Sequence, residues 1–188
     1  MIKVPYTLIL SGLLAAGSIQ SANAVDVSAE VMADAIHDVI EADRAVYVDL
    51  VIHRLVDEEE VIEATEAYYD DVTLPLPAQM LRASAEKVRE KNSGFSFSLV
   101  SPWPINSQNK VKTEAEVKGM DFILKNPTKN YYGEETIAGK KYFTALYADI
   151  AVSKSCVDCH NNHKDSAKKD FKVLDVMGAV LVRIPLGK

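Results

Sequence analysis

The pentapeptide at residues 156–160, Cys-Val-Asp-Cys-His, is the feature that most constrains this chain. A C-x-x-C-H sequence is the attachment motif of c-type haem. Its two thiols add across the two vinyl groups on one porphyrin edge, and the following histidine supplies the proximal ligand to iron. The chain has two cysteines, both in this motif. We therefore expect one covalently attached haem c, held by Cys156, Cys159 and His160.

Other kinds of site also use cysteines at this spacing. A thioredoxin-like redox pair lies in a βαβ unit behind an aromatic residue, whereas Ser155 precedes Cys156 here. Zinc could recruit Cys156, Cys159, His160 and His163, but zinc fingers usually place about twelve or more residues between the cysteine and histidine pairs. A disulfide between the two cysteines would close too small a loop to stabilise much. We favour haem over these alternatives.

The N-terminus has the pattern of a secretory signal peptide. Lys3 gives a positive n-region, residues 8–19 are apolar, and Ala-Asn-Ala ends at Ala24 as a cleavage site. We therefore assign residues 1–24 to a signal peptide and residues 25–188 to a single mature domain in the periplasm. An uncleaved anchor is the alternative, but the apolar run is short for a membrane span, and no span is expected in the mature chain.

Charge and motif content exclude some classes of function. The formal net charge is −6, and loss of residues 1–24, whose only charged residue is Lys3, changes it to −7. An acidic chain of this kind is not expected to bind nucleic acid. No Ser-His-Asp arrangement, phosphate-binding glycine loop or pair of catalytic carboxylates stands out, so we do not expect an enzyme.

Hydrophobic periodicity predicts helices in the first half of the chain. Residues 28–57 have apolar positions at helical spacing and acidic positions opposite, which predicts one long amphipathic helix. The apolar positions are Met32, Ile36, Val39, Ile40, Val46, Tyr47 and Leu50, and the acidic ones are Asp34, Asp38, Glu41 and Asp49. Further helices are expected at about 59–69 and at 77–91, the latter opened by Pro77.

After Gly94 the apolar period changes to two, which predicts strands. We expect strands at 95–101, 131–137, 141–152 and 176–184, and one helix at 113–125. The two middle strands form a hairpin across residues 138–140, and the haem motif follows in a loop. This order predicts an α+β fold in which helices flank an antiparallel sheet.

Several blocks of the sequence together resemble a known family. They are Ile36-His37-Asp38-Val39-Ile40-Glu41-Ala42-Asp43-Arg44, Leu74-Pro75-Leu76-Pro77-Ala78, Ser101-Pro102-Trp103-Pro104-Ile105-Asn106, Tyr142-Phe143-Thr144-Ala145-Leu146-Tyr147-Ala148-Asp149 and the stretch from Cys156 to Gly178. The blocks are similar to single-haem c-type domains with a PAS-like sheet, found free in the periplasm or as sensory parts of bacterial signalling proteins.

The resemblance implies a PAS-like sheet behind a long N-terminal helix, and a sensor for redox state or a small gas ligand. Related domains fused to kinases or chemoreceptors carry a transmitter, so here the output would pass to a separate redox or signalling protein partner. The first helix could form a homodimer or could equally pack on its own sheet. A periplasmic electron-transfer cytochrome c is the alternative function.

The second axial ligand of the iron separates gas binding from electron transfer. His53, near the edge of the apolar stripe of the first helix, is the first candidate and His37 the second, although bonding to water or backbone explains each equally well. His163 is too close to His160 in sequence to reach the opposite face of the haem. The methionine candidates are Met80, Met120 and Met177. Methionines among apolar residues usually fill the core, and an open sixth position is a further alternative.

Aromatic residues around the motif are candidates for a haem pocket, and core packing explains them equally well. They are Trp103, Tyr131, Tyr132, Phe143 and Phe171, together with Met177. Lys168, Lys169 and Arg183 could pair with haem propionates.

Overall fold

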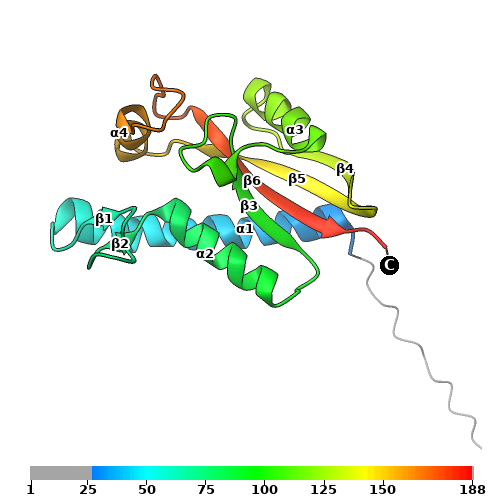
Figure 1. Ribbon diagram of the computed structural model, residues 1–188, viewed down its shortest axis with the longest axis horizontal. Coiled ribbons are helices and arrows are strands. Elements are labelled where there is room, and N and C mark those ends of the chain that lie inside the picture. Colours follow the sequence, from blue (N-terminus) through cyan, green and yellow to red (C-terminus); the bar gives the residue numbers. More distant parts are fainter. Residues whose placement is uncertain (1–26, 188) are drawn as a thin grey trace, which may run out of the picture.

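The computed structural model describes residues 27–187 and places helices on both faces of one main sheet (Figure 1). The elements are α1 (Ala29–Tyr47), η1 (Val48–Glu58), β1 (Ala64–Thr65), β2 (Leu74–Pro75), α2 (Pro77–Glu90), β3 (Ser96–Val100), η2 (Ser107–Asn109), α3 (Glu114–Lys125), β4 (Tyr131–Ile137), β5 (Lys140–Ile150), α4 (Lys154–Asn162) and β6 (Val176–Pro185). The expected signal peptide at residues 1–24 lies outside the described part. Within residues 27–187, no helix is long and apolar enough to cross a bilayer.

The main sheet has four strands in the order β3-β6-β5-β4, and all neighbours are antiparallel. This confirms the expected α+β class, with an antiparallel sheet flanked by helices and a long N-terminal helix. The β4–β5 hairpin turns at Ala138 and Gly139, whose φ angles of 49° and 79° suit a two-residue turn with two left-handed positions. Pairing with β4 ends at Leu146 of β5, so Tyr147–Ile150 extend beyond β4.

One face of the sheet packs against α1 and α2. Its buried side chains are Ala33, Leu81, Phe97, Ala145, Tyr147, Val180, Val182 and Ile184. They come from both helices and from three strands, so this cluster fixes α1 and α2 to the sheet. Burying one large apolar side chain contributes about 1.5–3 kcal/mol.

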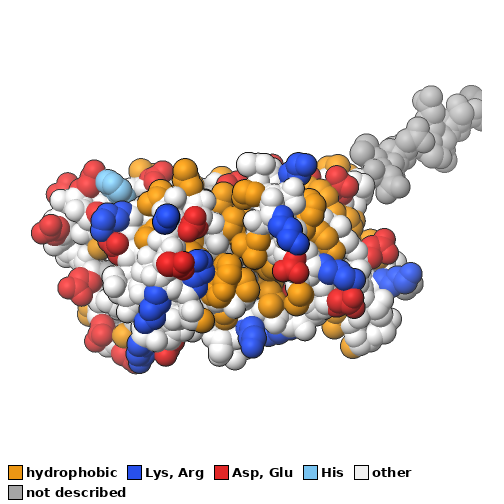
Figure 2. All heavy atoms as spheres, turned by 90° about the horizontal axis from the view of Figure 1, so that it is seen from above, with side chains coloured by type: hydrophobic (Ala, Val, Ile, Leu, Met, Phe, Trp, Pro, Cys, Tyr) orange, Lys and Arg blue, Asp and Glu red, His pale blue; other side chains and the backbone are white. Residues whose placement is uncertain are grey.

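The opposite face of the sheet packs against α3. Its buried side chains are Val100, Met120, Ile123, Leu146, Ala179 and Leu181. Because successive strand residues point to opposite faces, β5 and β6 supply side chains to both clusters. Figure 2, seen from the side of α3 and α4, shows hydrophobic side chains gathered in the middle of this face.

The long helix expected at 28–57 is confirmed, with one difference in its second half. Ser28 caps α1, since its hydroxyl accepts a hydrogen bond from the amide of Val31 at 3.2 Å. The last eleven residues, η1, are π-helical instead of α-helical. The spacing of apolar residues did not predict this change, because residues four apart lie on neighbouring turns in both helix types.

The face of α1 that meets the sheet differs from the expected stripe. Ile36 and Ile40 pack against the core, but Val39, Val46 and Leu50 are 62%, 55% and 60% exposed. The apolar positions of α1 therefore form two sectors, of which only one faces the sheet. Sequence spacing merges the two sectors, because it does not show where the sheet lies.

The prediction of a helix at residues 59–69 is wrong. Glu60 has a φ of 50°, a left-handed conformation that ends a helix. Residues 64–65 instead form β1, which pairs in parallel with β2. A hydrogen bond of 2.8 Å between the Thr65 and Thr73 hydroxyls supports this short pairing. The acidic run at 57–60 is therefore the end of the long helix and not the start of another.

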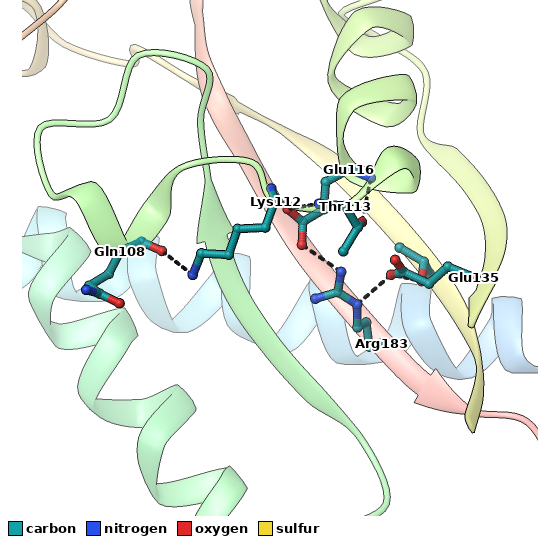
Figure 3. A network of polar contacts seen from close by, with 7 residues as sticks. Gln108, Lys112, Thr113, Glu116, Glu135 and Arg183 are labelled. Atoms are coloured by element: carbon teal, nitrogen blue, oxygen red, sulfur yellow. Dashed lines mark hydrogen bonds and ion pairs between the residues drawn. The ribbon is translucent and has the colours of Figure 1, made fainter. Parts of the chain in front are cut away.

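A buried ionic network joins α3 to the sheet (Figure 3). Arg183 of β6 donates to Glu135 of β4 and to Glu116 of α3, both at 2.6 Å. The carboxylate side chains of Glu116 and Glu135 are only 4% and 8% exposed. Burial alone would raise the pKa of Glu135, but hydrogen bonds led by that from Arg183 hold it below its usual value. Thr144 donates a further hydrogen bond to Glu135 at 2.8 Å.

Replacing Arg183 by methionine should lower the free energy of unfolding by about 3–5 kcal/mol, because two buried carboxylates lose their cation. Arg82→Met removes the exposed pair between Arg82 and Glu86 on α2 and should cost less than about 1 kcal/mol. Urea unfolding followed by circular dichroism measures both changes. Similar losses in the two variants would contradict the argument from burial.

Candidate functional site

The C-x-x-C-H motif lies on α4, and residues 151–153 separate this helix from the end of β5. Ser153 caps the helix, since its hydroxyl accepts from the Cys156 amide at 3.4 Å and lies 3.2 Å from the Cys156 sulfur. The expectation of a loop at the motif is therefore wrong. The segment carries too few apolar residues to show helical periodicity, so the cap was the only local sign of a helix.

The helix brings the reactive groups of the motif to one side. Cys159 and His160 lie three and four residues after Cys156, and residues three or four apart are neighbours on a helix surface. Both cysteines are free thiols, Cys156 half-buried and Cys159 exposed. Two thiols and one imidazole are thus available together within little more than one helical turn.

His160 has a buried nitrogen that the described residues leave without a hydrogen bond. This atom is Nδ1, and the ring lies edge-on to Phe171 with the ring centroids 6.0 Å apart. A buried polar atom without a partner costs about 1–3 kcal/mol, so such an atom marks a place where a group from outside the chain is expected. Burial lowers the pKa of His160, which favours the neutral ring that can bind a metal.

The pKa of the Cys159 thiol lies above its usual value. Partial loss of hydration at this exposed residue raises the pKa most, and the nearby carboxylate of Glu66 and the thiol of Cys156 raise it further. Adding a thiol to a vinyl group forms one C–S and one C–H bond from one S–H and one C=C bond, so it needs no oxidant or reductant. The donor set of α4 therefore fits a c-type haem, with His160 as the iron ligand.

An apolar cluster lies against the inner side of α4. Ala151, Phe171 and Met177 are buried in it, and Trp103, Cys156 and Val157 pack against them. The Trp103 and Phe171 rings meet edge to face with centroids 5.8 Å apart. The Lys168 ammonium lies 5.5 Å from the Trp103 ring and 4.9 Å from the Phe171 ring. This cluster gives α4 an apolar wall with one basic group at its edge.

Two polar side chains hold this wall in place. Asn161, directly after the motif, donates from its side-chain amide to the Phe171 carbonyl and accepts from the Phe171 amide, both at 3.0 Å. Ser101 donates to the Met177 carbonyl at 2.7 Å and accepts from the Trp103 amide at 3.0 Å. Segments far apart in the sequence are thereby fixed next to α4. Neither side chain was predicted, and for Asn161 the only signal was its position next to the motif.

An ion pair connects the start of the site to α1. Arg44 donates to Asp149, the penultimate residue of β5, at 2.6 Å. The two side chains are only 26% and 19% exposed, so this pair is less screened by water than a surface pair. His160 lies close enough to both groups for their charges to act on its pKa. The sequence did not single out this pair, because its two residues are 105 positions apart.

The other histidines lie in three different settings. His53, the first candidate for a distal ligand, is on η1 with its side chain 58% exposed and its Nδ1 3.4 Å from a Glu58 oxygen. His37, the second candidate, stacks on Tyr147 with ring centroids 3.9 Å apart, and burial lowers its pKa. His163 lies 3.1 Å from a Glu66 oxygen, which joins α4 to the segment after β1.

The structure separates the expected pocket residues and the methionine candidates for an iron ligand into two groups. Trp103, Phe171 and Met177 are in the cluster beside α4. Those elsewhere are Tyr132 and Phe143 beside α1 and α2, Tyr131 and Met120 beside α3, and Met80 on α2. Arg183 is held by Glu116 and Glu135, so its expected role as a propionate partner is wrong. Lys168 is the basic residue that lies at the apolar wall.

Comparisons with known proteins agree with this fold and add a family. A family model described as Tll0287-like matches residues 21–185. No protein with a curated description matches the chain. Among solved structures, the chain is similar to the crystal structure of the cyanobacterial haem protein Tll0287, at 16% sequence identity. The similarity covers 85% of this chain and 97% of that one, with a TM-score of 0.54. At this identity the likeness shows a shared fold.

Asn161→Ala should lower the free energy of unfolding by about 1–3 kcal/mol, because both hydrogen bonds to the Phe171 backbone are lost. The neighbouring Asn162 is exposed and its side chain makes no hydrogen bond within the described residues. Asn162→Ala should therefore change the stability by less than about 0.5 kcal/mol. Chemical denaturation of both variants tests this, and equal effects would show that the Asn161 anchor is unimportant.

Proposed function

The chain belongs to the Tll0287-like family, and from that membership and the site on α4 we propose that it carries one covalently bound haem c. Cys156 and Cys159 bond the porphyrin edge, and His160 holds the iron from one side. The observation that supports this most strongly is the combination, on one side of α4, of two free thiols and an imidazole with an unpartnered buried nitrogen. The solved protein with this fold is itself described as a haem protein.

When bound, haem supplies reversible one-electron exchange and coordination of small gases at its iron. The residues of the chain control access to that chemistry. Trp103, Phe171 and Met177 form the apolar wall that excludes water beside His160. Lys168 pairs with the exposed carboxylate of Asp170, and it could exchange or share that partner with an acidic group such as a propionate. Asn161 and Ser101 keep the wall fixed.

We propose a sensor for redox state or a small gas, with α1 as the element that receives the change. Asp149 lies four residues before Ser153, the N-cap of α4, and pairs with Arg44 of α1. A shift of α4 or a change of charge at His160 therefore acts on a partly buried contact with the longest helix of the described chain. Both candidates for a distal ligand lie on the α1–η1 helix, and His53 remains the first candidate and His37 the second.

A periplasmic electron carrier is the second candidate, and one observation favours it. Cys159 is exposed, so a porphyrin bonded there has an edge open to a redox partner. In this case the iron keeps both axial ligands and only its charge cycles. The sequence at residues 1–24 supports export in either case, and the expected partner is a separate redox or signalling protein.

Replacing Cys156 and Cys159 together by alanine should abolish the haem that stays with the chain after denaturation. The test is a pyridine haemochrome assay and a haem stain on a denaturing gel, with protein made in a host that matures c-type cytochromes. Ser155→Ala changes an exposed neighbour of the motif and should keep the full haem content. A colourless wild-type chain with two titratable thiols would overturn the proposed function.

Carbon monoxide titration of the reduced protein separates a gas sensor from an electron carrier. A gas sensor should bind carbon monoxide with a shift of the visible spectrum, whereas a carrier, or a sensor of redox state alone, whose iron would be held by two residues of the chain should not respond. In the oxidised protein, His53→Ala should change the visible spectrum if His53 is the distal ligand. An unchanged spectrum in His53→Ala with a change in His37→Ala would assign that role to His37 instead.

A further inference from the structure

The outer side of α1 and of the first turn of η1 carries apolar residues that no other part of the described chain covers. We call this surface the outer stripe, and its members are Val31, Met32, Ala35, Val39, Ala42, Ala45, Val46 and Leu50. The five large ones among them are between 36% and 62% exposed. The side of α1 that meets the sheet carries different residues, among them Ala33, Ile36 and Ile40. In Figure 1, α1 runs along the length of the molecule, partly behind α2 and β3.

The spacing along the outer stripe is that of a helix that pairs with another helix. Met32, Ala35, Val39, Ala42 and Val46 follow one another at intervals of three, four, three and four residues. This is the a and d pattern of a coiled coil, in which β-branched residues at a favour two strands. The alanines at the d positions allow two helices to approach closely.

The outer stripe provides exposed apolar residues for a dimer. A specific interface at the lower end of the size range buries roughly 600 Å² per partner, and the five large members of the stripe, 36% to 62% exposed, are the residues available for it together with three exposed alanines. A large exposed apolar surface on a monomer usually marks an interaction site. We propose that a second copy of this chain covers the outer stripe, forming a symmetric dimer through α1. This inference does not depend on haem binding.

The charges around the outer stripe make the strength of the proposed dimer depend on salt concentration. Asp38, Asp43 and Asp49 are exposed on this side of the helix, and Asp49 stands at the next position of the three-four spacing after Val46, where that spacing of apolar residues ends. Arg44, the only Lys or Arg between residues 31 and 50, is paired with Asp149. Two copies therefore bring like charges together. Salt screens such repulsion, so the dimer should tighten as ionic strength rises. A complex with a basic partner would weaken instead.

Sedimentation equilibrium of the purified full chain tests the proposal at about 50 mM and about 500 mM salt, over concentrations up to about 100 μM. We expect a dimer that is tighter at the higher salt concentration. Val39→Asp should raise the dissociation constant by about 30-fold or more, because it places an unpaired charge in the interface. Asp43→Asn should lower it.

Val72→Asp is the matched control, because Val72 is 94% exposed and lies outside α1. It should leave the dissociation constant unchanged, and both valine variants should keep the circular dichroism spectrum of the wild type. A chain that stays monomeric at every concentration and salt level would overturn the proposal. So would a dimer that Val39→Asp leaves intact, since another surface would then form it.

Discussion

Burial of both faces of the paired strands β5 and β6 is the constraint on which the arrangement of this protein depends. One face is closed by α1 and α2, and the other by α3. Alternate residues of β5 and β6 point into opposite clusters. A movement of the helices on one face would therefore also displace the strand residues that pack on the other face. The strand β5 then leads directly to α4. The site is therefore attached to the most constrained part of the described chain.

This attachment explains how a small helix can be a suitable place for covalent chemistry. A nine-residue helix is marginal by itself, but α4 is capped by Ser153, tied to Phe171 through Asn161, and packed against an apolar wall. The contact between Arg44 and Asp149 adds a route from this region to α1. The sheet thus lies between α4 and the N-terminal helix, and the two are connected through this one ion pair as well as through the core.

Much of the fold could be predicted from local patterns, because those patterns reflect local physics. The strands from Ser96 onward, the hairpin at Ala138 and Gly139, and the helices α1, α2 and α3 follow from apolar periodicity, turn residues and caps. The failures have a common cause. The choice of which side of α1 faces the sheet, the left-handed turn at Glu60, and the pairing of Arg183 with two buried carboxylates all depend on segments distant in sequence. At the site, the motif identified the two thiols and the imidazole as donor groups. It did not identify the apolar wall of Trp103, Phe171 and Met177, or the side chains of Asn161 and Ser101 that hold this wall.

The unequal lengths of β4 and β5 have a consequence for solubility. The last four residues of β5 extend beyond β4, so their outer backbone groups form an open strand edge of the kind that templates aggregation. The register between β5 and β6 shifts between Asp149 and Ile150, where β6 has one extra residue, and the chain then leaves the sheet through residues 151–153 to α4. The open edge of β5 is therefore only four residues long, and so short an edge offers another chain little to pair with. The exit of the chain from the sheet toward α4 thus also limits self-templated misassembly.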